Sequence, residues 1–384
     1  MKWDDVIVDA AATDTGMRRA NNQDSHAMVR ASTAERWEKR GHVYMVADGM
    51  GAHAVGELAS KLAVDNIPHN YAKAKDGSPA EAVTKAYKEV GALIHGRATA
   101  NREFQGMGTT CSTLVMLPAG ALIAHVGDSR VYRVRGSRID QLSFDHSLVW
   151  ELVRQKHLSP EQAEKTVPRN VITRSLGPDP TVEVDIEGPL PVEPGDVFLL
   201  CSDGLSGPVK DDELGVFAGN FHPEDACRYL IHLANLRGGH DNITVVILRA
   251  GAWVEPGSGE TDEFTTHAGV PRKKGGFRLS NMLQGLKRRP VAEPVEEHLY
   301  VSTECPADEP IVERLDALVR QSKAQAIEAA WPADWAALAN HVRDAEERRG
   351  VGDFRGALKH LGESIALLGT AARLRRRDHA NGSH

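Results

Sequence analysis

Short runs of apolar residues, separated by turn residues, dominate the first 250 positions of the chain. Each run has the length of a β-strand, and several are apolar almost throughout, which predicts strands that are buried on both faces. The runs are HVYMVAD, CSTLVML, ALIAHVGD, RVYRVRG, DVFLLCSD and NITVVILR. The tight connection LPAGA between two of them predicts a hairpin, and therefore antiparallel pairing.

Three longer stretches have helical spacing of their apolar residues, over about 53–72, 78–103 and 222–236. The last of these begins with Pro223 and has acidic residues in its first turn, as helix N-termini commonly do. Clusters of strands mixed with a few long helices predict a layered α+β fold over residues 1–250. They argue against regular βαβ repetition.

The composition changes after about residue 250. Residues 251–303 are rich in Gly, Pro, Ser and charge, which predicts a flexible linker. Inside it, the segment RKKGGFRLSNMLQGLKRRP is basic and contains no acidic residue. Such a segment can dock on a partner or on a membrane surface, or it can be a solvated linker with incidental apolar residues; basic runs are weak signals, so we favour the linker.

Helical periodicity resumes in the C-terminal part of the chain. Over residues 304–375, apolar residues recur three and four positions apart, which predicts a small all-helical domain. No second copy recurs at a fixed period, so the pattern does not predict a repeat array. We expect residues 376–384 to form a disordered tail.

Composition and charge narrow the class of protein. The chain has 384 residues and a formal net charge of −7, so we expect no nucleic acid among its partners. The N-terminus does not resemble a signal peptide, and no apolar run approaches the roughly 20 residues that span a bilayer. The cysteines form no CxxC pair, and three of them lie in apolar runs, which favours buried thiols in a reducing cytoplasm.

Aspartates stand at the ends of several predicted strands, each beside glycine or another small residue. Asp48, Asp128 and Asp203 follow strands, and Asp241 precedes one. If these strand ends gather at one edge, the carboxylates repel one another unless a cation neutralises them. Oxygen ligands without His or Cys suit Mg²⁺ or Mn²⁺. Each motif alone is most often a turn or a cap, but together they predict a site for two divalent cations.

Residues near these aspartates fit the same chemistry. Gly49 allows a backbone carbonyl to approach an ion. Arg18 and Arg19 precede a polar cluster, and a guanidinium can bind phosphate oxygens through two hydrogen bonds, although most arginines simply lie on the surface. Asp24 either extends the group of carboxylates or caps a turn.

These blocks together resemble the metal-dependent serine/threonine protein phosphatases of type 2C, the PPM family, and its bacterial members most of all. The resemblance covers roughly residues 5–250 and rests on RRANNQDS, VADGMGAHAVGELAS, GMGTTCSTLV, AHVGDSRVYRV, DHSLV, VITRSLG, LLCSDGL and GGHDNIT, in that order. It implies a four-layer α-β-β-α sandwich of two antiparallel sheets flanked by helices. Here the linker and the helical C-terminal region would follow.

The resemblance also implies a metal site. Asp48 would bridge two Mn²⁺ or Mg²⁺ ions, the Gly49 carbonyl would bind one of them, and Asp203 and Asp241 would complete the pair. Asp128 matches a position that helps to hold a third ion in bacterial members. A hydroxide that bridges the two ions would then attack the phosphorus directly, with no phosphoenzyme.

Further residues take roles from the same resemblance. Arg19 matches the arginine that binds the substrate phosphate. Asp24 and Asn242 are candidates for supporting the metal ligands from behind. Residues 145–177 fall where the family carries a mobile flap beside the cleft, whose sequence would affect the choice of substrate.

The sequence departs from the family pattern at three positions. Gln23 stands where many members have a glutamate, which removes one negative charge near the metals. Met50 stands where animal relatives place a histidine proposed as general acid, so we expect the leaving oxygen to take its proton from water. Ala52 replaces a glycine. None of these changes removes a primary metal carboxylate.

We therefore expect a protein phosphatase that acts on phosphoserine and phosphothreonine and opposes a bacterial Ser/Thr kinase. Its partners would be phosphorylated proteins, including that kinase. The alternative is a signalling adaptor with weak or no catalysis, whose C-terminal helices dock a protein partner. Gln23 and the helical extension motivate this alternative. A third candidate is a metal-dependent hydrolase of small phosphoesters or nucleotides.

Overall fold

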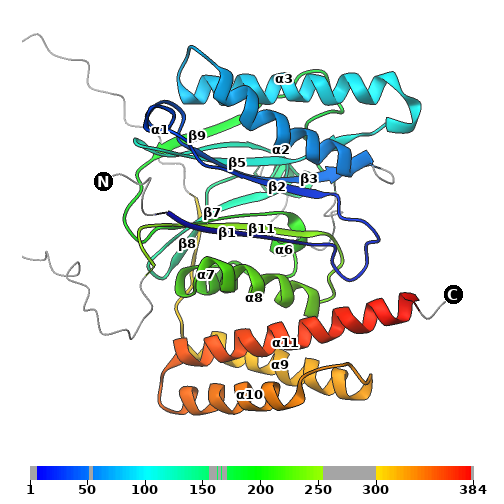
Figure 1. Ribbon diagram of the computed structural model, residues 1–384, viewed down its shortest axis with the longest axis vertical. Helices are drawn as coiled ribbons and strands as arrows, with labels where there is room; N and C mark the ends of the chain where they lie inside the picture. Colours follow the sequence, from blue (N-terminus) through cyan, green and yellow to red (C-terminus); the bar gives the residue numbers. More distant parts are fainter. Residues whose placement is uncertain are drawn as a thin grey trace, which may run out of the picture. The chain divides into compact units, whose positions relative to one another are not determined.

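Two antiparallel β-sheets form the centre of the fold (Figure 1). The computed structural model describes residues 7–51, 55–154, 162, 166, 171–253 and 300–381. In the first sheet the strand order is β1 (Ile7–Asp14), β11 (Ile243–Ala250), β10 (Val197–Cys201), β7 (Arg130–Arg135), β8 (Arg138–Gln141) and β12 (Val301–Glu304). In the second it is β2 (Asp24–Val29), β3 (His42–Met50), β5 (Cys111–Leu117), β6 (Gly120–Val126) and β9 (Asp185–Leu190), with β4 (Gly108–Thr109) paired to the end of β3.

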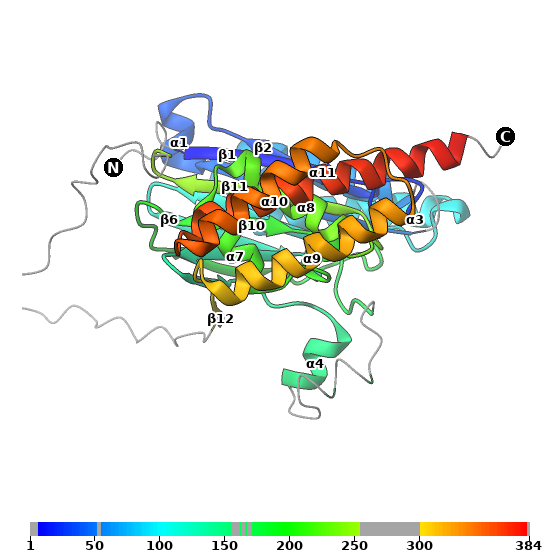
Figure 2. The same cartoon turned by 90° about the horizontal axis from the view of Figure 1, so that it is seen from below.

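Helices cover the outer faces of both sheets (Figures 1 and 2). The second sheet is covered by α2 (Val55–Lys73) and α3 (Pro79–Ala100), and the first by α7 (Asp211–Asn220) and α8 (Pro223–Leu236). Short helices lie between strands: α1 (Ala34–Arg40), η2 (Arg102–Phe104), α4 (Leu148–Arg154) and α6 (Asp203–Ser206). The C-terminal part contains α9 (Glu309–Glu328), α10 (Trp335–Gly350) and α11 (Phe354–Asn381).

Side chains alternate between the two faces of each central strand, and both faces are buried, which explains why these strands are apolar throughout. In β11, Val245 and Ile247 belong to the core under the helices, whereas the equally buried Val246 and Leu248 point to the other face. That face lies against β3 of the second sheet. Both faces of each central strand are therefore buried, as the unbroken apolar runs predicted.

The sandwich of two antiparallel sheets flanked by helices confirms the expected fold class. The strands and long helices predicted from the apolar runs are present, and LPAGA joins β5 to β6 as a hairpin. Two strands at the start of the chain were not predicted. They are β1, with the sequence IVDAAATD, and β2, with DSHAMV, and both lack the unbroken apolar run of the central strands.

The C-terminal helices share a hydrophobic core with the first sheet. Leu358, Leu361 and Ile365 of α11 belong to the same buried cluster as Tyr229 and Leu230 of α8. Glycines in α11 allow this close approach, since a Cβ at Gly362 would lie 2.7 Å from the Tyr229 ring. Helices α9, α10 and α11 thus form a further helical layer on α8, beyond the expected four layers (Figure 1).

Two boundaries differ from the sequence expectation. Val301–Glu304 lies at the end of the expected linker but forms β12, which pairs with β8, and Ser302 Oγ donates a hydrogen bond to Asp140 Oδ1 at 2.6 Å. Helix α11 continues to Asn381, beyond the start of the expected tail, because its last turns contact the N-terminal domain. The basic segment lies outside the described residues. Among the helices that the structure describes, none is long and apolar enough to cross a membrane.

A carboxylate on α11 holds the C-terminal helices against α8. Arg228 donates hydrogen bonds to both Glu363 carboxylate oxygens, at 2.7 and 2.9 Å, and Tyr229 Oη donates a third at 2.6 Å. The hydrogen bonds from Arg228, and then that from Tyr229, lower the pKa of Glu363 from 4.5 to about 2. Because the folded-state pKa lies below the ordinary value, this carboxylate stabilises the fold above about pH 4.5 and loses that effect as the pH falls toward 2.

We predict that Glu363→Gln lowers the free energy of unfolding at pH 7 by about 1.5–3 kcal/mol, the usual range for hydrogen bonds to a charged group. The difference in the free energy of unfolding between the variant and the unsubstituted protein should decrease below about pH 4.5, as the carboxylate becomes protonated. Urea unfolding at several pH values measures both quantities. Glu347→Gln, at an exposed ion pair of 3.8 Å on α10, is the matched control. A difference in the free energy of unfolding that stays constant down to pH 3.5 would contradict the stabilising role of the ionised Glu363.

Candidate active site

The first pair of predicted site residues comes from neighbouring strands of the second sheet. Asp24 of β2 is the direct register partner of Asp48 of β3, so both side chains project from the same face of the sheet. The Asp48 backbone is held by Thr110, whose Oγ1 accepts from Asp48 N at 2.9 Å and whose N donates to Asp48 O at 2.9 Å. Pairing along the strands thus places two carboxylates side by side.

The second pair comes from neighbouring strands of the first sheet. Asp203 follows β10, and Asp241 precedes β11, which is antiparallel to β10, so both lie at the same end of the sheet. A Cβ on Gly204 would lie only 1.9 Å from the Asn242 carbonyl oxygen, so glycine is required where the two chain segments meet. This close contact brings the Asp203 and Asp241 segments together.

A buried serine joins the two sheets at this edge. Ser202 Oγ donates a hydrogen bond to Asp24 Oδ2 at 2.7 Å and accepts one from Thr244 N at 3.0 Å. Asp24 belongs to the second sheet, whereas Thr244 lies in β11 of the first sheet and Ser202 directly follows β10 of that sheet. The sequence analysis did not single out Ser202. Its only local signal is its position directly before Asp203.

The aspartates raise one another's pKa. Burial, then the charges of Asp24, Asp203, Asp128 and Asp241, raise the pKa of Asp48 well above its ordinary value. Burial raises the pKa of Asp24 and of Asp128 to about 7, with Asp203 adding to both shifts. Burial and Asp241 also raise the pKa of Asp203. The carboxylates therefore lie close enough to repel one another, as their positions at strand ends predicted.

These carboxylates have the chemistry of a site for hard cations. One buried oxygen, Oδ1, of each of Asp24, Asp128 and Asp203 has no hydrogen-bond partner among the described residues. Among the residues that the structure describes, no three His, Cys, Asp or Glu side chains lie close enough together to form a complete metal site. A buried oxygen without a donor is costly, and a divalent cation such as Mg²⁺ or Mn²⁺ would satisfy it. The chemistry of these oxygens therefore fits the cations that the sequence predicts.

The predicted phosphate-binding arginine lies beside this group. Arg19 is on the loop between β1 and β2, and its Nη2 donates to Asp241 Oδ2 at 2.6 Å. This hydrogen bond is the main cause that raises the pKa of Arg19. Half of the Arg19 side chain is exposed, so the ion pair contributes little to stability, about 0.2–1 kcal/mol, and a phosphate can compete for the guanidinium.

Asn242 ties the Arg19 loop to the first sheet. Its Nδ2 donates to the carbonyls of Thr15 and Asn21, at 3.1 and 2.9 Å, and its Oδ1 accepts from Gln23 N at 2.8 Å. The Gln23 side chain, at the position where many family members have a glutamate, donates to Gly51 O at 3.3 Å. The Asn242 side chain thus positions the loop by binding the backbone atoms of the loop.

Gly49 lies where β3 and α2 meet. A Cβ there would be 2.0 Å from the Gly56 carbonyl oxygen, so only glycine allows the approach. Met50 follows as the last residue of β3. Ala52 lies outside the described residues.

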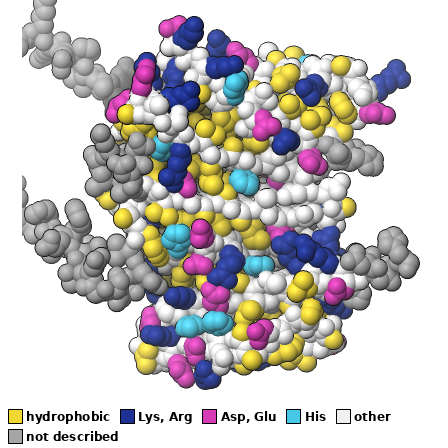
Figure 3. Space-filling view, in the orientation of Figure 1, with side chains coloured by type: hydrophobic (Ala, Val, Ile, Leu, Met, Phe, Trp, Pro, Cys, Tyr) yellow, Lys and Arg dark blue, Asp and Glu magenta, His cyan; other side chains and the backbone are white. Residues whose placement is uncertain are grey.

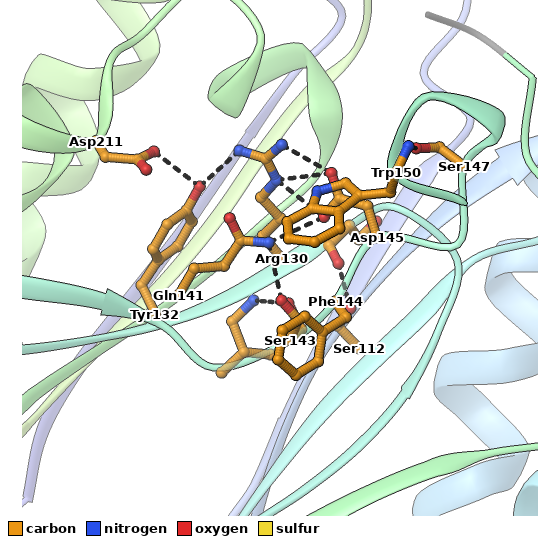
Figure 4. A network of polar contacts seen from close by, with 12 residues as sticks. Ser112, Arg130, Tyr132, Gln141, Ser143, Phe144, Asp145, Ser147, Trp150 and Asp211 are labelled. Atoms are coloured by element: carbon orange, nitrogen blue, oxygen red, sulfur yellow. Dashed lines mark hydrogen bonds and ion pairs between the residues drawn. The ribbon is translucent and has the colours of Figure 1, made fainter. Parts of the chain in front are cut away.

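Asp128 lies at the turn after β6. Two residues that act on its charge, Arg130 and Asp145, belong to a network of polar contacts that no sequence pattern predicted (Figure 4). Arg130 binds both Asp145 carboxylate oxygens, at 2.7–3.1 Å, and donates to Tyr132 Oη at 3.0 Å. Gln141 Nε2 also donates to Asp145, at 3.1 Å. The charge of Asp145 helps to raise the pKa of Asp128, and that of Arg130 opposes it.

This network fixes the start of the segment expected to form a flap. Asp145 is followed by α4, and the Phe144 and Trp150 rings pack edge to face at 5.8 Å (Figure 4). Residues 155–161, 163–165 and 167–170, the middle of the expected flap, lie outside the described residues. The Arg130–Asp145 pair joins residues that are distant in sequence, so no local pattern announces it.

A sandwich of two antiparallel sheets with a group of buried carboxylates and an exposed arginine at one edge has the features of a metal-dependent phosphohydrolase. The sequence pattern of the protein phosphatase 2C family matches residues 17–234. Protein phosphatase PhpP of Streptococcus pneumoniae is 34% identical over 241 residues, which cover 62% of this chain and 94% of that protein.

Comparison with solved structures leads to the same family. The serine/threonine phosphatase PstP/Ppp of Mycobacterium tuberculosis gives a TM-score of 0.57 at 32% identity, over 64% of this chain and 99% of that one. The catalytic domain of PstP in complex with two manganese ions gives a TM-score of 0.54 at 31% identity, over 64% and 98%. This chain belongs to the protein phosphatase 2C family, of bacterial type, and is a phosphatase. The family prediction is confirmed.

We predict that Mn²⁺ or Mg²⁺ raises the melting temperature of the full chain after dialysis against EDTA, because a bound cation relieves the repulsion among the buried carboxylates. An ion at 100 times its Kd stabilises a fold by about 2.7 kcal/mol. Differential scanning calorimetry measures the shift. Asp203→Asn should reduce it, whereas Asp65→Asn, an exposed aspartate on α2, should not. Equal shifts in all three proteins would exclude Asp203 as a ligand.

Proposed function

We propose that this chain removes phosphate from phosphoserine and phosphothreonine in proteins and opposes a bacterial Ser/Thr kinase. The observation that carries the proposal is the ion pair of the exposed Arg19 with Asp241, next to buried carboxylates whose pKa values are raised. A group suited to cations and a group suited to phosphate would thus meet at one edge of the sandwich. The names of the relatives, serine/threonine phosphatases of bacteria, support the choice of substrate.

The metal ligands we propose are the ones that the sequence predicts. Asp48 would lie between two cations, the Gly49 carbonyl would bind one of them, and Asp203 and Asp241 would complete the pair. Asp128 would help to hold a third, weaker ion. Two Mn²⁺ or Mg²⁺ ions bound there would supply a water of lowered pKa as the nucleophile and positive charge against the phosphate oxygens.

The other steps fall to residues of the chain itself. Arg19 would release Asp241 and donate two hydrogen bonds to the phosphate, since its guanidinium fork matches phosphate geometry. Ser202 and Thr110 keep the carboxylates in place through the hydrogen bonds described above. Met50 has no proton to give, so the leaving serine or threonine oxygen would take its proton from water.

We expect the full chain with Mn²⁺ to hydrolyse p-nitrophenyl phosphate and phosphothreonine peptides, and EDTA to abolish this activity. Asp203→Asn should lower kcat at least about 100-fold, because losing a direct ligand costs more than the 10–100-fold of a supporting residue. Asp65→Asn serves as the control. Steady-state rates of phosphate release measure these effects, and full activity in EDTA would refute the proposal.

The same assay separates the competing functions. An adaptor would show little turnover of any substrate with either metal. A hydrolase of small phosphoesters would act on nucleotides faster than on phosphopeptides. Phosphoproteomics in the native host, with the unsubstituted protein and with Asp203→Asn, would test the kinase assignment, because sites of that kinase should gain phosphate in the variant.

A further inference from the structure

The last turns of α11 reach the loop that carries Arg19 (Figure 1). The Arg376 guanidinium donates from Nη1 to the Gly16 carbonyl and from Nη2 to the Arg19 carbonyl, the second at 2.5 Å. One side chain of the C-terminal helix thus binds the backbone of the predicted phosphate-binding residue itself. The family match ends at residue 234, so this contact comes from a part of the chain beyond it.

A second arginine, one helical turn earlier, binds the start of the same loop. Arg373 Nη1 forms an ion pair with Asp14 Oδ2, and the Asp14 side chain is 1% exposed. The other oxygen, Asp14 Oδ1, accepts from Gly16 N at 2.8 Å. Arg373 and Arg376 therefore hold the loop from Asp14 to Arg19 at both ends.

The other side of the loop rests on the active site. Met17 N donates to the Gly239 carbonyl at 2.7 Å, and Asn242 Nδ2 donates to the Thr15 carbonyl. The loop is thus enclosed between the segment that carries Asp241 and helix α11. Without α11, only the segment that carries Asp241 would support the loop.

Helix α11 is itself firmly placed. Its apolar residues share the core of the first sheet, and Glu363 binds Arg228 and Tyr229 of α8. A helix that is fixed along its length can hold its last turn in a defined position. The position of Arg19 then depends on the packing of the C-terminal helices.

We propose that α11 is a positioning element of the active site, in which Arg376 and Arg373 hold the Arg19 loop in the conformation that binds the substrate phosphate. The proposal rests on the proposed function, because it assigns a role to the arginine of that site. Neither Arg376 nor Arg373 would touch the substrate. The C-terminal helices then contribute to turnover, whether or not they also bind a partner.

Charge alone offers a different explanation. Arg373, Arg376 and Arg377 line a hollow of about 250 Å³ together with Thr15, Gly16 and Ala20. Figure 3 shows Lys and Arg side chains gathered in this region. A basic surface could attract phosphate without any effect of loop geometry. Arg377 is exposed, and among the described residues its side chain forms no hydrogen bond or ion pair with the loop, so its substitution removes the same charge and leaves the two supports in place.

We expect Arg376→Ala to raise about tenfold both the KM for p-nitrophenyl phosphate and the inhibition constant of inorganic phosphate, with a smaller effect on kcat. Arg376→Lys keeps the charge but cannot reproduce the fork of two donors, so most of the loss should remain. Arg377→Ala should stay within about twofold of the unsubstituted protein. Full recovery in Arg376→Lys, or an equal loss in Arg377→Ala, would overturn the proposal in favour of charge.

A double-mutant cycle tests whether the effect passes through Arg19. In an Arg19→Ala background, Arg376→Ala should have little further effect on the inhibition constant of phosphate, because the residue that it positions is gone. The same tenfold change in both backgrounds would show that Arg376 acts elsewhere. Equal melting temperatures of the single variants confirm that the helices remain docked.

Hydrogen exchange supplies a readout that does not depend on turnover. Backbone amides of residues 14–20 should exchange faster in Arg376→Ala than in the unsubstituted protein or in Arg377→Ala. If the protein lacks phosphatase activity but shows this change, the proposed function fails, and Arg376 still holds the Arg19 loop in place. If it is active but neither the exchange nor the KM changes, the positioning role fails and the proposed function stands.

Discussion

Repulsion among buried carboxylates is the constraint on which the rest of this structure depends. Asp24 and Asp48 are brought together by strand pairing in one sheet, and Asp203 and Asp241 by neighbouring strands in the other. Nothing in ordinary packing favours such a group, because each burial raises the free energy of the charged form. The backbone hydrogen bonds of two complete sheets hold these residues in place. The sandwich thus acts as a frame that holds unfavourable charges close to one another.

The C-terminal helices are also part of the support of this site. In the described residues, the C-terminal helices form part of the core of the first sheet, and Arg376 of α11 binds the backbone of the loop that carries Arg19. The site is thus supported from both sides, by Asn242 on the sheet and by Arg376 on the helix. The helical C-terminal region, which the sequence predicted as a separate domain, lies within hydrogen-bond distance of the loop that carries Arg19.

The comparison with the sequence shows which features local patterns can predict. Central strands such as β5 and β11 were predicted because both of their faces are buried, which leaves an unbroken apolar run. The aspartates were predicted because each stands between such a run and a glycine or another small residue. Strands β1 and β2 were missed because they are short of large apolar residues. Ser202, the Arg130–Asp145 pair and the arginines of α11 act through contacts that are distant in sequence, and these leave no periodic signal.

The return of the chain to the first sheet has a consequence for the stretch between β11 and β12. Both strands belong to that sheet, so the chain between them begins and ends at one sheet. The entropy of closing such a loop grows only with the logarithm of its length, at about 0.6 kcal/mol for each doubling. A change in the number of residues between β11 and β12 should therefore alter the free energy of closing this connection only slightly.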